Sequence, residues 1–172
     1  DVERSRGLGD VYKRQLAGGT DVLVQLKIGN NSPDHLIDIK QIPGVKEIAL
    51  REDGGWTIGA AVSGVQLTNH KKLSSEWPGL VEGMELVGSA QIQSRATLVG
   101  NLCNGSPAAD SVPGMIAAGA TVSVVSSSGT AEIRVEDIPV GPGLTNLGTG
   151  EIITAVNLPK RNKHEGDAYL RF

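Results

Sequence analysis

The sequence predicts an α+β fold in two lobes. Helix-like and strand-like segments are mixed along the chain without the regular strand–helix alternation of a doubly wound parallel sheet. Aromatic residues make up only 3% of the sequence, so Val, Ile, Leu and Ala must build the core. A turn-like stretch at 51–55 suggests a boundary, with lobe one at about 16–52 and lobe two at about 56–172.

Composition and charge exclude several classes of protein. A net charge of −3 over 172 residues leaves no basic face for nucleic acid. The longest apolar stretches are too short for a membrane span, and the charged start carries no signal peptide, so we expect a cytoplasmic protein. Cys103 is the single cysteine, which excludes a disulfide within the chain and an iron–sulfur cluster held by four of its own thiolates.

Residues 1–15 show no helical or strand period, and their charges are scattered. The chain also begins with Asp1 rather than Met. We interpret this segment as a foreign leader or sequence read-through, and a genuine solvated tail is the alternative. In either case we expect the segment to be dispensable for folding.

The first lobe is expected to begin with a helix over 21–27. Its apolar residues Val22, Leu23 and Leu26 have helical spacing, and Thr20 is a suitable N-cap. A Gly-Asn pair then ends the helix. The strands expected after it are 35–40, 45–50 and 56–60, of which the last two flank the Asp-Gly-Gly turn at 53–55.

The second lobe is expected to carry helices before its last strands. Ser63 can cap a short helix. Pro78 opens the next helix, and its residues Leu80, Met84 and Val87 share one face that should be buried. The remaining expectations are an end of the first of these helices near 72, a helix at 113–120, and strands at 120–126, 131–135 and 152–158.

Several common catalytic and cofactor motifs are missing from the sequence. It contains neither the dinucleotide-binding pattern Gly-x-Gly-x-x-Gly nor the P-loop pattern, and it has no nucleophile elbow. His35, His70 and His164 lack metal-ligand spacing, so each is expected at the surface or at a strand edge. We therefore expect no metal site and no catalytic acid–base pair in this chain.

The first candidate binding segment is Ala-Gly-Gly-Thr at 17–20, directly before the expected helix. Paired glycines allow consecutive backbone N–H groups to face one point, and the start of a helix adds further unpaired donors. A diphosphate is the ligand that such donors suit. A tight turn between a strand and a helix explains the same residues equally well.

The second candidate segment runs over 97–110 and is rich in small residues, hydroxyls and amides. Such residues can donate N–H and O–H groups to phosphate oxygens, and Asp110 can accept a hydrogen bond from a ribose or ribityl hydroxyl. The alternative is an ordinary Gly/Ser/Asn loop whose side chains bond to their own backbone.

Together the two segments resemble the paired flavin-binding segments of the medium (flavoprotein) subunits of molybdenum hydroxylases, the family of xanthine and carbon monoxide dehydrogenases. That family has Ala-Gly-Gly-Thr-Asp before a helix and, farther on, a Thr-x-Gly-Gly-Asn-like segment that leads to Ser-Pro and Asp. The resemblance covers about 16–172. Further stretches in family order are 35–40, 58–60, 91–93, 141–145 and 151–153.

The resemblance implies a two-lobed FAD-binding fold of the vanillyl-alcohol-oxidase (PCMH) type. It also implies that residues 17–21 and 97–101 surround the pyrophosphate of FAD, and that Leu147 makes an apolar contact. The residues that the resemblance assigns to FAD are Ala17, Gly18, Gly19, Thr20, Asp21, Thr97, Leu98, Val99, Gly100, Asn101, Asn104, Ser106, Asp110, Leu147 and Arg171.

The chain also departs from the family pattern. Gln93 stands where many relatives have Arg, and Val99 stands where they usually have a small residue. Because a β-branched residue disfavours positive φ, Val99 requires an ordinary backbone conformation or weakens the site. The family's N-terminal strand is missing where residues 1–15 stand, and the chain ends at Phe172, so we expect a fragment that lacks the family's C-terminal domain.

For function, the resemblance implies an FAD-dependent electron-transfer subunit. Electrons then reach FAD from [2Fe-2S] clusters on a small partner subunit, after oxidation of a substrate at molybdopterin on a large partner subunit, and leave to NAD or another acceptor. A stand-alone flavin oxidase or reductase of the same fold is one alternative, and a non-catalytic scaffold that has lost FAD is another. Cys103 is expected to be a packed residue rather than a redox thiol, because no basic or paired-cysteine context surrounds it.

Overall fold

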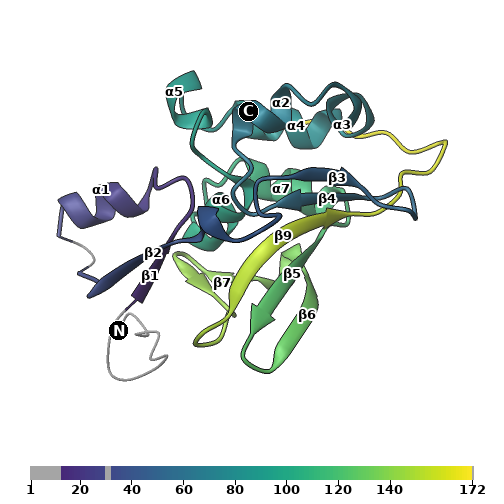
Figure 1. The fold of residues 1–172 in the computed structure, drawn as a ribbon. Coiled ribbons are helices and arrows are strands. Elements are labelled where there is room, and N and C mark those ends of the chain that lie inside the picture. Colours follow the sequence, from purple (N-terminus) through teal and green to yellow (C-terminus); the bar gives the residue numbers. More distant parts are fainter. Residues whose placement is uncertain (1–12, 30–31, 172) are drawn as a thin grey trace.

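The computed structural model describes residues 13–29 and 32–171, and its elements form two unequal parts (Figure 1). A small unit at 13–41 contains a two-stranded sheet, and a larger part contains a five-stranded sheet and the other helices. The expected α+β class with two lobes is therefore confirmed. No helix in these described ranges is both long enough and apolar enough to cross a membrane.

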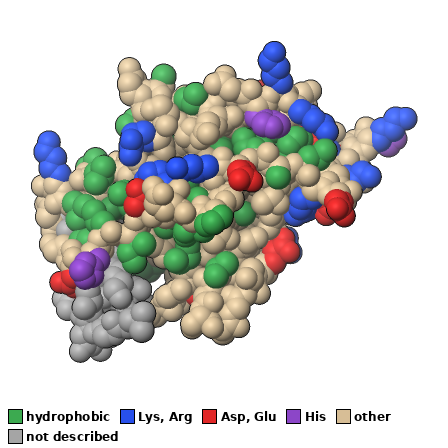
Figure 2. Space-filling model, in the orientation of Figure 1, with side chains coloured by type: hydrophobic (Ala, Val, Ile, Leu, Met, Phe, Trp, Pro, Cys, Tyr) green, Lys and Arg blue, Asp and Glu red, His purple; other side chains and the backbone are tan. Residues whose placement is uncertain are grey.

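The small unit is a strand–helix–strand motif. Strand β1 (Lys13–Leu16) pairs in parallel with β2 (His35–Asp38), and α1 (Val22–Lys27) connects them; the 3-10 helix η1 (Ile39–Gln41) follows. Figure 2 shows hydrophobic side chains gathered on the surface over α1. Val24 and Ile28 are 56% and 62% exposed, and α1 buries none of its residues.

The N-terminal expectation is wrong for residues 13–15, which belong to β1. The expected start of the domain at residue 16 falls inside this strand. Three polar residues open this strand, so it has no hydrophobic alternation to reveal it. Backbone pairing with β2 defines the strand instead. The expectation for residues 1–12 lies outside the described part of the chain.

The chain enters the larger sheet earlier than expected. Strand β3 (Ile48–Leu50) pairs with β4 (Trp56–Gly59), and both belong to the five-stranded sheet. Residues 51–55, the expected lobe boundary, are instead the hairpin turn between these strands. The chain passes from the small sheet to the five-stranded sheet between Gln41 and Ile48. The boundary lies there because the sheet that a strand joins is decided by its hydrogen-bond pairing.

The five-stranded sheet has the strand order β3-β4-β9-β5-β6, and all neighbouring pairs are antiparallel. The hairpin of β5 (Thr121–Ser126) and β6 (Gly129–Arg134) forms one side of the sheet. Strand β9 (Ile152–Leu158) comes last in the sequence but lies in the middle, between β4 and β5. The sheet is therefore complete only when the end of the chain has folded back into it.

The two faces of this sheet differ in polarity. On one face, Asn157 accepts a hydrogen bond from the Thr57 hydroxyl at 3.0 Å and donates to the Ser123 hydroxyl at 2.8 Å. Val122 and Val156, next along their strands, point to the other face and are fully buried. That apolar face packs in one core with helix residues such as Leu80 and Met115.

Six helices lie between β4 and β5 in the sequence. Ser63 caps the first with a reciprocal capping box to Gln66, as its sequence predicts. The expected single helix after Ser63 is two helices, because His70 accepts from the Leu73 N–H and starts a new one. The six are α2 (Gly64–Thr68), α3 (Lys71–Glu76), α4 (Pro78–Glu85), α5 (Ala90–Gln93), α6 (Leu98–Asn104) and α7 (Ser111–Ala117).

The C-terminal segment 159–171 returns across α4. Asp167 accepts a hydrogen bond from the Leu80 N–H at 3.2 Å and forms an ion pair with Arg161 at 2.6 Å. The Arg161 guanidinium lies 4.8 Å from the centre of the Trp77 ring. Between β6 and β9 the chain forms the 3-10 helix η2 (Val135–Asp137) and the hairpin of β7 (Pro139–Gly141) with β8 (Leu144–Thr145).

Candidate functional site

The glycine turn, residues 17–20, joins β1 to α1. Gly19 has a φ of 81°, a left-handed conformation that glycine adopts without strain. Gly18 lies against the backbone of Arg95, where a Cβ atom would come within 1.9 Å of the carbonyl oxygen. Within the described residues, neither the Gly18 N–H nor the Gly19 N–H donates to a protein acceptor. The turn therefore offers two backbone donors at a point where larger residues do not fit.

Two cationic side chains contact this turn. Lys40 Nζ donates to the Ala17 carbonyl at 2.9 Å, and Arg95 Nε donates to the Gly18 carbonyl at 3.0 Å. Lys40 also pairs with Asp38 at 2.8 Å. Hydrogen bonds from the Lys40 side chain and from its backbone N–H hold the pKa of the Asp38 carboxyl below its ordinary value.

The second candidate segment begins as a helix, whereas the binding and structural interpretations of the sequence both treated it as a loop. Thr97 caps α6, and its hydroxyl accepts from the Gly100 N–H at 2.9 Å. Leu98, Val99 and Leu102 form the buried face of α6, and Gly105 ends it with a φ of 62°. Helical periodicity was present in these apolar residues, but the surrounding Gly, Ser and Asn residues concealed it.

Val99 has an ordinary backbone conformation. It lies in the right-handed helix α6, so its branched side chain causes no strain. Its side chain and that of Leu98 belong to the core, and only their backbone atoms remain for a ligand. Thr97 is 3% exposed, and its oxygen is already engaged as the helix cap.

The glycine turn and α6 are joined by a short chain of polar side chains. Asn104 Nδ2 donates to Asp21 Oδ1 at 3.2 Å, and Gln25 Nε2 donates to Asn104 Oδ1 at 3.1 Å. The Thr20 hydroxyl donates to the other carboxylate oxygen of Asp21 at 3.4 Å. Residues more than 80 positions apart are thus adjacent, as the pairing of the two segments in the sequence suggested.

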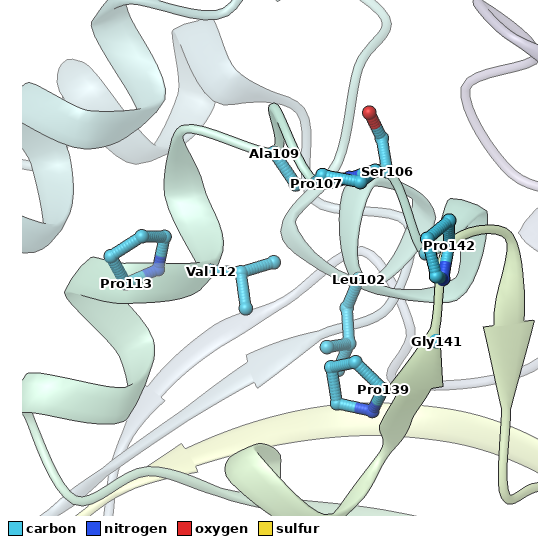
Figure 3. Close-up of a pocket in the computed structure, with 10 residues that line it drawn as sticks. Leu102, Ser106, Pro107, Ala109, Val112, Pro113, Pro139, Gly141 and Pro142 are labelled. Carbon is cyan, nitrogen blue, oxygen red and sulfur yellow. The ribbon is translucent and has the colours of Figure 1, made fainter.

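The loop after α6 lines a pocket of about 290 Å³ (Figure 3). Leu102 and Val112 point into it from two helices, and Pro139 closes it from β7. The Ser106 hydroxyl points away from the other labelled side chains and accepts from the Ala108 N–H at 3.2 Å. The volume is at the lower limit for ligand pockets, which suits one ring of a cofactor rather than a whole dinucleotide.

The other expected site residues lie at different distances from the turn. Asn101 Oδ1 accepts from the Ser111 hydroxyl at 2.6 Å, which ties α6 to α7. Arg171 Nη1 lies 3.7 Å from Asp110 Oδ1, so the C-terminal segment reaches the second candidate segment. Leu147 is half-buried and packs against the apolar core.

Sequence reasoning did not select Lys40, Arg95 or Gln25, although each contacts the predicted segments. Arg95 stands two residues before Thr97, and Lys40 ends a stretch that resembles the family. For Arg95 and Lys40, closeness in the sequence to a predicted segment could therefore have identified them as site residues. The contact of Gln25 with Asn104 joins residues 79 positions apart and has no local signal.

The residues present fit a phosphate-containing cofactor such as FAD. The glycine turn provides backbone donors and adjacent cations, as described above. A Cβ atom built on Gly100 would meet only Thr97 Oγ1 within 4 Å, at 2.9 Å, so the space beside Gly100 is otherwise open. Asp110 adds a half-buried carboxylate suited to sugar hydroxyls.

The other side chains with possible chemical reactivity, Cys103 and the three histidines, pack against neighbouring residues or lie at the surface. In the described ranges, no group of three or more His, Cys, Asp or Glu residues could hold a metal ion. Cys103 is partly buried and packs against the core. His35 and His164 are exposed, whereas His70 is half-buried at the start of α3 with its ring 5.1 Å from that of Trp56.

Comparison with known families gives one match that covers most of the chain. Residues 10–161 match the FAD binding domain in molybdopterin dehydrogenase. The match starts at residue 10, before residue 16, where we expected the resemblance to begin.

Named relatives and solved structures agree with this match. The chain is 34% identical to the xanthine dehydrogenase FAD-binding subunit of Escherichia coli O157:H7, over 91% of this chain and 54% of that protein. It is 32% identical to the nicotinate dehydrogenase FAD-subunit of Eubacterium barkeri, over 99% of this chain and 60% of that protein. The chain thus spans little more than half the length of these curated relatives.

Among solved structures, carbon monoxide dehydrogenase from Hydrogenophaga pseudoflava has a chain that superimposes with a TM-score of 0.83 at 26% identity, over 88% of this chain and 52% of that one. Quinoline 2-oxidoreductase from Pseudomonas putida 86 gives a TM-score of 0.81 at 26% identity, over 87% of this chain and 52% of that one. The sequence and structural similarities therefore each cover most of this chain.

Proposed function

The chain belongs to the family of FAD-binding domains of molybdopterin dehydrogenases, and we propose that it is the FAD-binding part of an electron-transfer subunit. In this proposal, electrons arrive from iron–sulfur clusters on a small partner subunit and leave to NAD or another acceptor. Substrate oxidation takes place at molybdopterin on a large partner subunit. FAD supplies the redox chemistry, and this chain binds and orients it.

The contact between the glycine turn and α6 is the observation that carries the proposal. The Asn104–Asp21 hydrogen bond of 3.2 Å brings the glycine turn, with its unpaired Gly18 and Gly19 N–H groups, next to α6. A turn with only a structural role needs neither the unpaired Gly18 and Gly19 donors nor an open space beside Gly100. These features are expected when an anionic ligand completes the hydrogen bonding.

The predicted site residues take different roles in this proposal. Backbone N–H groups of Gly18 and Gly19 donate to the diphosphate, and Gly100 leaves room for it. Asp21 carries a negative charge that repels a diphosphate at short range, so it binds Asn104 and holds the turn against α6. Thr97 supports the same region as a helix cap.

The remaining assignments concern the rest of the cofactor. Asp110, near Arg171, is placed to accept from a sugar or ribityl hydroxyl. The pocket of about 290 Å³ accepts a ring, because partly exposed apolar side chains such as Val112 and Pro139 line it. Leu147 and Ser106 remain proposed contacts from the family resemblance.

The subunit role is supported by the names of relatives. These include subunits or medium chains of xanthine, nicotinate and carbon monoxide dehydrogenases. Because this chain spans little more than half of the first two, the acceptor and the partner subunits are parts of the proposal rather than properties of the domain. Copurification with the products of neighbouring reading frames, followed by oxidation of the reduced flavin with NAD⁺, tests both.

Flavin binding itself is tested by the visible absorption spectrum of the purified protein. We expect a flavin spectrum, and we expect the colour to stay in solution when the protein is precipitated with acid, because binding is non-covalent. Gly100→Val should weaken FAD by more than about tenfold, since its side chain occupies the open space.

Gly166→Val is the matched control, because Gly166 lies in the C-terminal segment and a Cβ atom there would meet only Arg161, at 3.9 Å. It should bind FAD like the unchanged protein. A purified, folded protein that neither contains nor takes up FAD would overturn the proposal.

A further inference from the structure

The glycine turn is held by two side-chain hydrogen bonds to successive peptide groups. Lys40 bonds the carbonyl of the Ala17–Gly18 peptide, and Arg95 bonds the carbonyl of the Gly18–Gly19 peptide. A glycine pair has little conformational preference of its own, so its peptide planes need external contacts to be fixed. These two side chains come from outside the turn, one from η1 and one from the residues before α6.

The orientation of the two N–H groups follows from these contacts. All described peptide bonds are trans, and in a trans peptide the C=O and N–H bonds point in opposite directions. Fixing the Ala17 carbonyl on Lys40 therefore directs the Gly18 N–H away from Lys40. Fixing the Gly18 carbonyl on Arg95 directs the Gly19 N–H away from Arg95 in the same way.

We propose that Lys40 and Arg95 are the positioning residues of this site, which orient the Gly18 and Gly19 N–H groups to donate to the diphosphate of the cofactor. The proposal rests on the proposed FAD-binding function. Both residues contact the turn rather than the ligand, and the diphosphate is the part of the ligand whose binding depends on them.

The two cations differ in electrostatic surroundings. Lys40 Nζ is 2.8 Å from Asp38 Oδ1, so the pair carries little net charge. Lys40 therefore acts mainly by orienting the Ala17–Gly18 peptide rather than by its charge. Arg95 has an exposed side chain, and within the described residues no carboxylate lies within 4.0 Å of it. Arg95 therefore adds an unneutralised positive charge beside the turn, which attracts an anionic ligand in a salt-dependent manner.

The test measures binding of FAD and of ADP, which shares the diphosphate, to four purified variants. Lys40→Met and Arg95→Gln should each raise the Kd for both ligands by about tenfold, the loss expected when one charge-assisted hydrogen bond is impaired. Both substitutions lower the local charge by one unit, Lys40→Met because it leaves the Asp38 carboxylate without its partner, so both should also reduce the salt-dependent attraction of the ligand. Lys71→Met on α3 and Arg134→Gln on β6, where Arg134 is paired with Glu136, remove cations that do not contact the turn and should leave both Kd values unchanged.

Nuclear magnetic resonance separates positioning from general stabilisation. In the unchanged protein, ADP should shift the Gly18 and Gly19 amide proton signals downfield, as new hydrogen bonds form. In Lys40→Met and Arg95→Gln, these shifts should shrink while the dispersed spectrum of a folded protein remains. Arg95→Lys keeps the charge and should restore the salt dependence but not the full shift of Gly19.

The outcomes separate this proposal from the proposed function. If FAD binds and the variants bind it like the unchanged protein, or ADP leaves both amide signals in place, the positioning role is overturned and the FAD function stands. If the unchanged protein binds neither FAD nor ADP, both proposals fail. If Lys40→Met is unfolded, the Arg95 variants alone decide.

Discussion

The larger lobe and the small β1–α1–β2 unit are stabilised in different ways. In the larger lobe, Leu102, Met115 and Val122 are fully buried within one continuous apolar core. In the small unit, α1 buries no residue and all of β2 is exposed. Among its described residues, Ile39 is buried in the core and Ala17 packs against the core partly buried. Polar contacts at the glycine turn fasten this unit to the rest of the molecule.

This difference indicates how the work is divided between the two parts. A parallel sheet normally has both faces covered, and two strands alone are marginal. The larger lobe therefore supplies stability, whereas the small unit supplies a glycine turn whose position depends on a few hydrogen bonds. Elements that bind ligands are often the less stable ones, and the cofactor of the proposed function, bound at this turn, would add its binding energy to the contact between the two parts.

The largest effect is expected from a truncation in the core of the larger lobe. Leu102→Ala removes most of a fully buried side chain from α6 and should lower the free energy of unfolding by about 2–5 kcal/mol. Chemical denaturation followed by circular dichroism measures this. A loss below about 1 kcal/mol would show that the larger lobe tolerates cavities as well as the small unit does.

A smaller effect is expected at the cap of α6. Thr97→Ala removes the oxygen that accepts from the Gly100 N–H and should cost about 0.5–2 kcal/mol of stability. Thr97→Ser keeps an oxygen in place and is the control. Because Thr97 is buried as a cap, FAD affinity of the folded Thr97→Ala protein should fall by less than about tenfold.

The sequence resemblance alone makes a different prediction for this residue. A Thr97 hydroxyl bonded to phosphate would cost about ten- to hundredfold in FAD affinity when removed. Titration of FAD into the folded variant distinguishes the two. A hundredfold loss with unchanged thermal stability would restore Thr97 as a direct ligand.

The junction between the two parts should respond locally. Asn104→Ala removes the hydrogen bonds to Asp21 and Gln25, each worth about 0.5–1.5 kcal/mol. Hydrogen exchange should accelerate at the amides of α1 and remain unchanged at those of β9. Equal acceleration in both elements would contradict the separation of the two parts.

The smallest effect is expected on the exposed face of α1. Val24 is 56% exposed, so Val24→Ala should change the free energy of unfolding by no more than about 0.5 kcal/mol. Chemical denaturation of this variant beside Leu102→Ala gives the comparison directly. A loss above about 1 kcal/mol would mean that α1 is buried in the protein in solution.

Local patterns in the sequence correctly predicted many elements and the general class of fold. The apolar period of 21–27 gave α1, Ser63 and Pro78 marked helix starts, and the last strand matched 152–158. The two candidate binding segments were also visible, because glycines and hydroxyl-rich stretches are local features. Their meaning as a pair came from the resemblance to a family rather than from residue physics.

Tertiary structure decided the features that depend on pairing between distant residues. Strand β1 and the true boundary between the sheets are defined by hydrogen bonds to other strands, which composition does not encode. Thr97 carries the same hydroxyl whether it binds a phosphate or caps a helix, and only the position of Gly100 N–H distinguishes the two. Lys40 and Arg95 look like ordinary surface cations in the sequence. Their role appears only when folding brings them to the carbonyls of Ala17 and Gly18, because a hydrogen bond requires distance and direction that no spacing along the chain can specify.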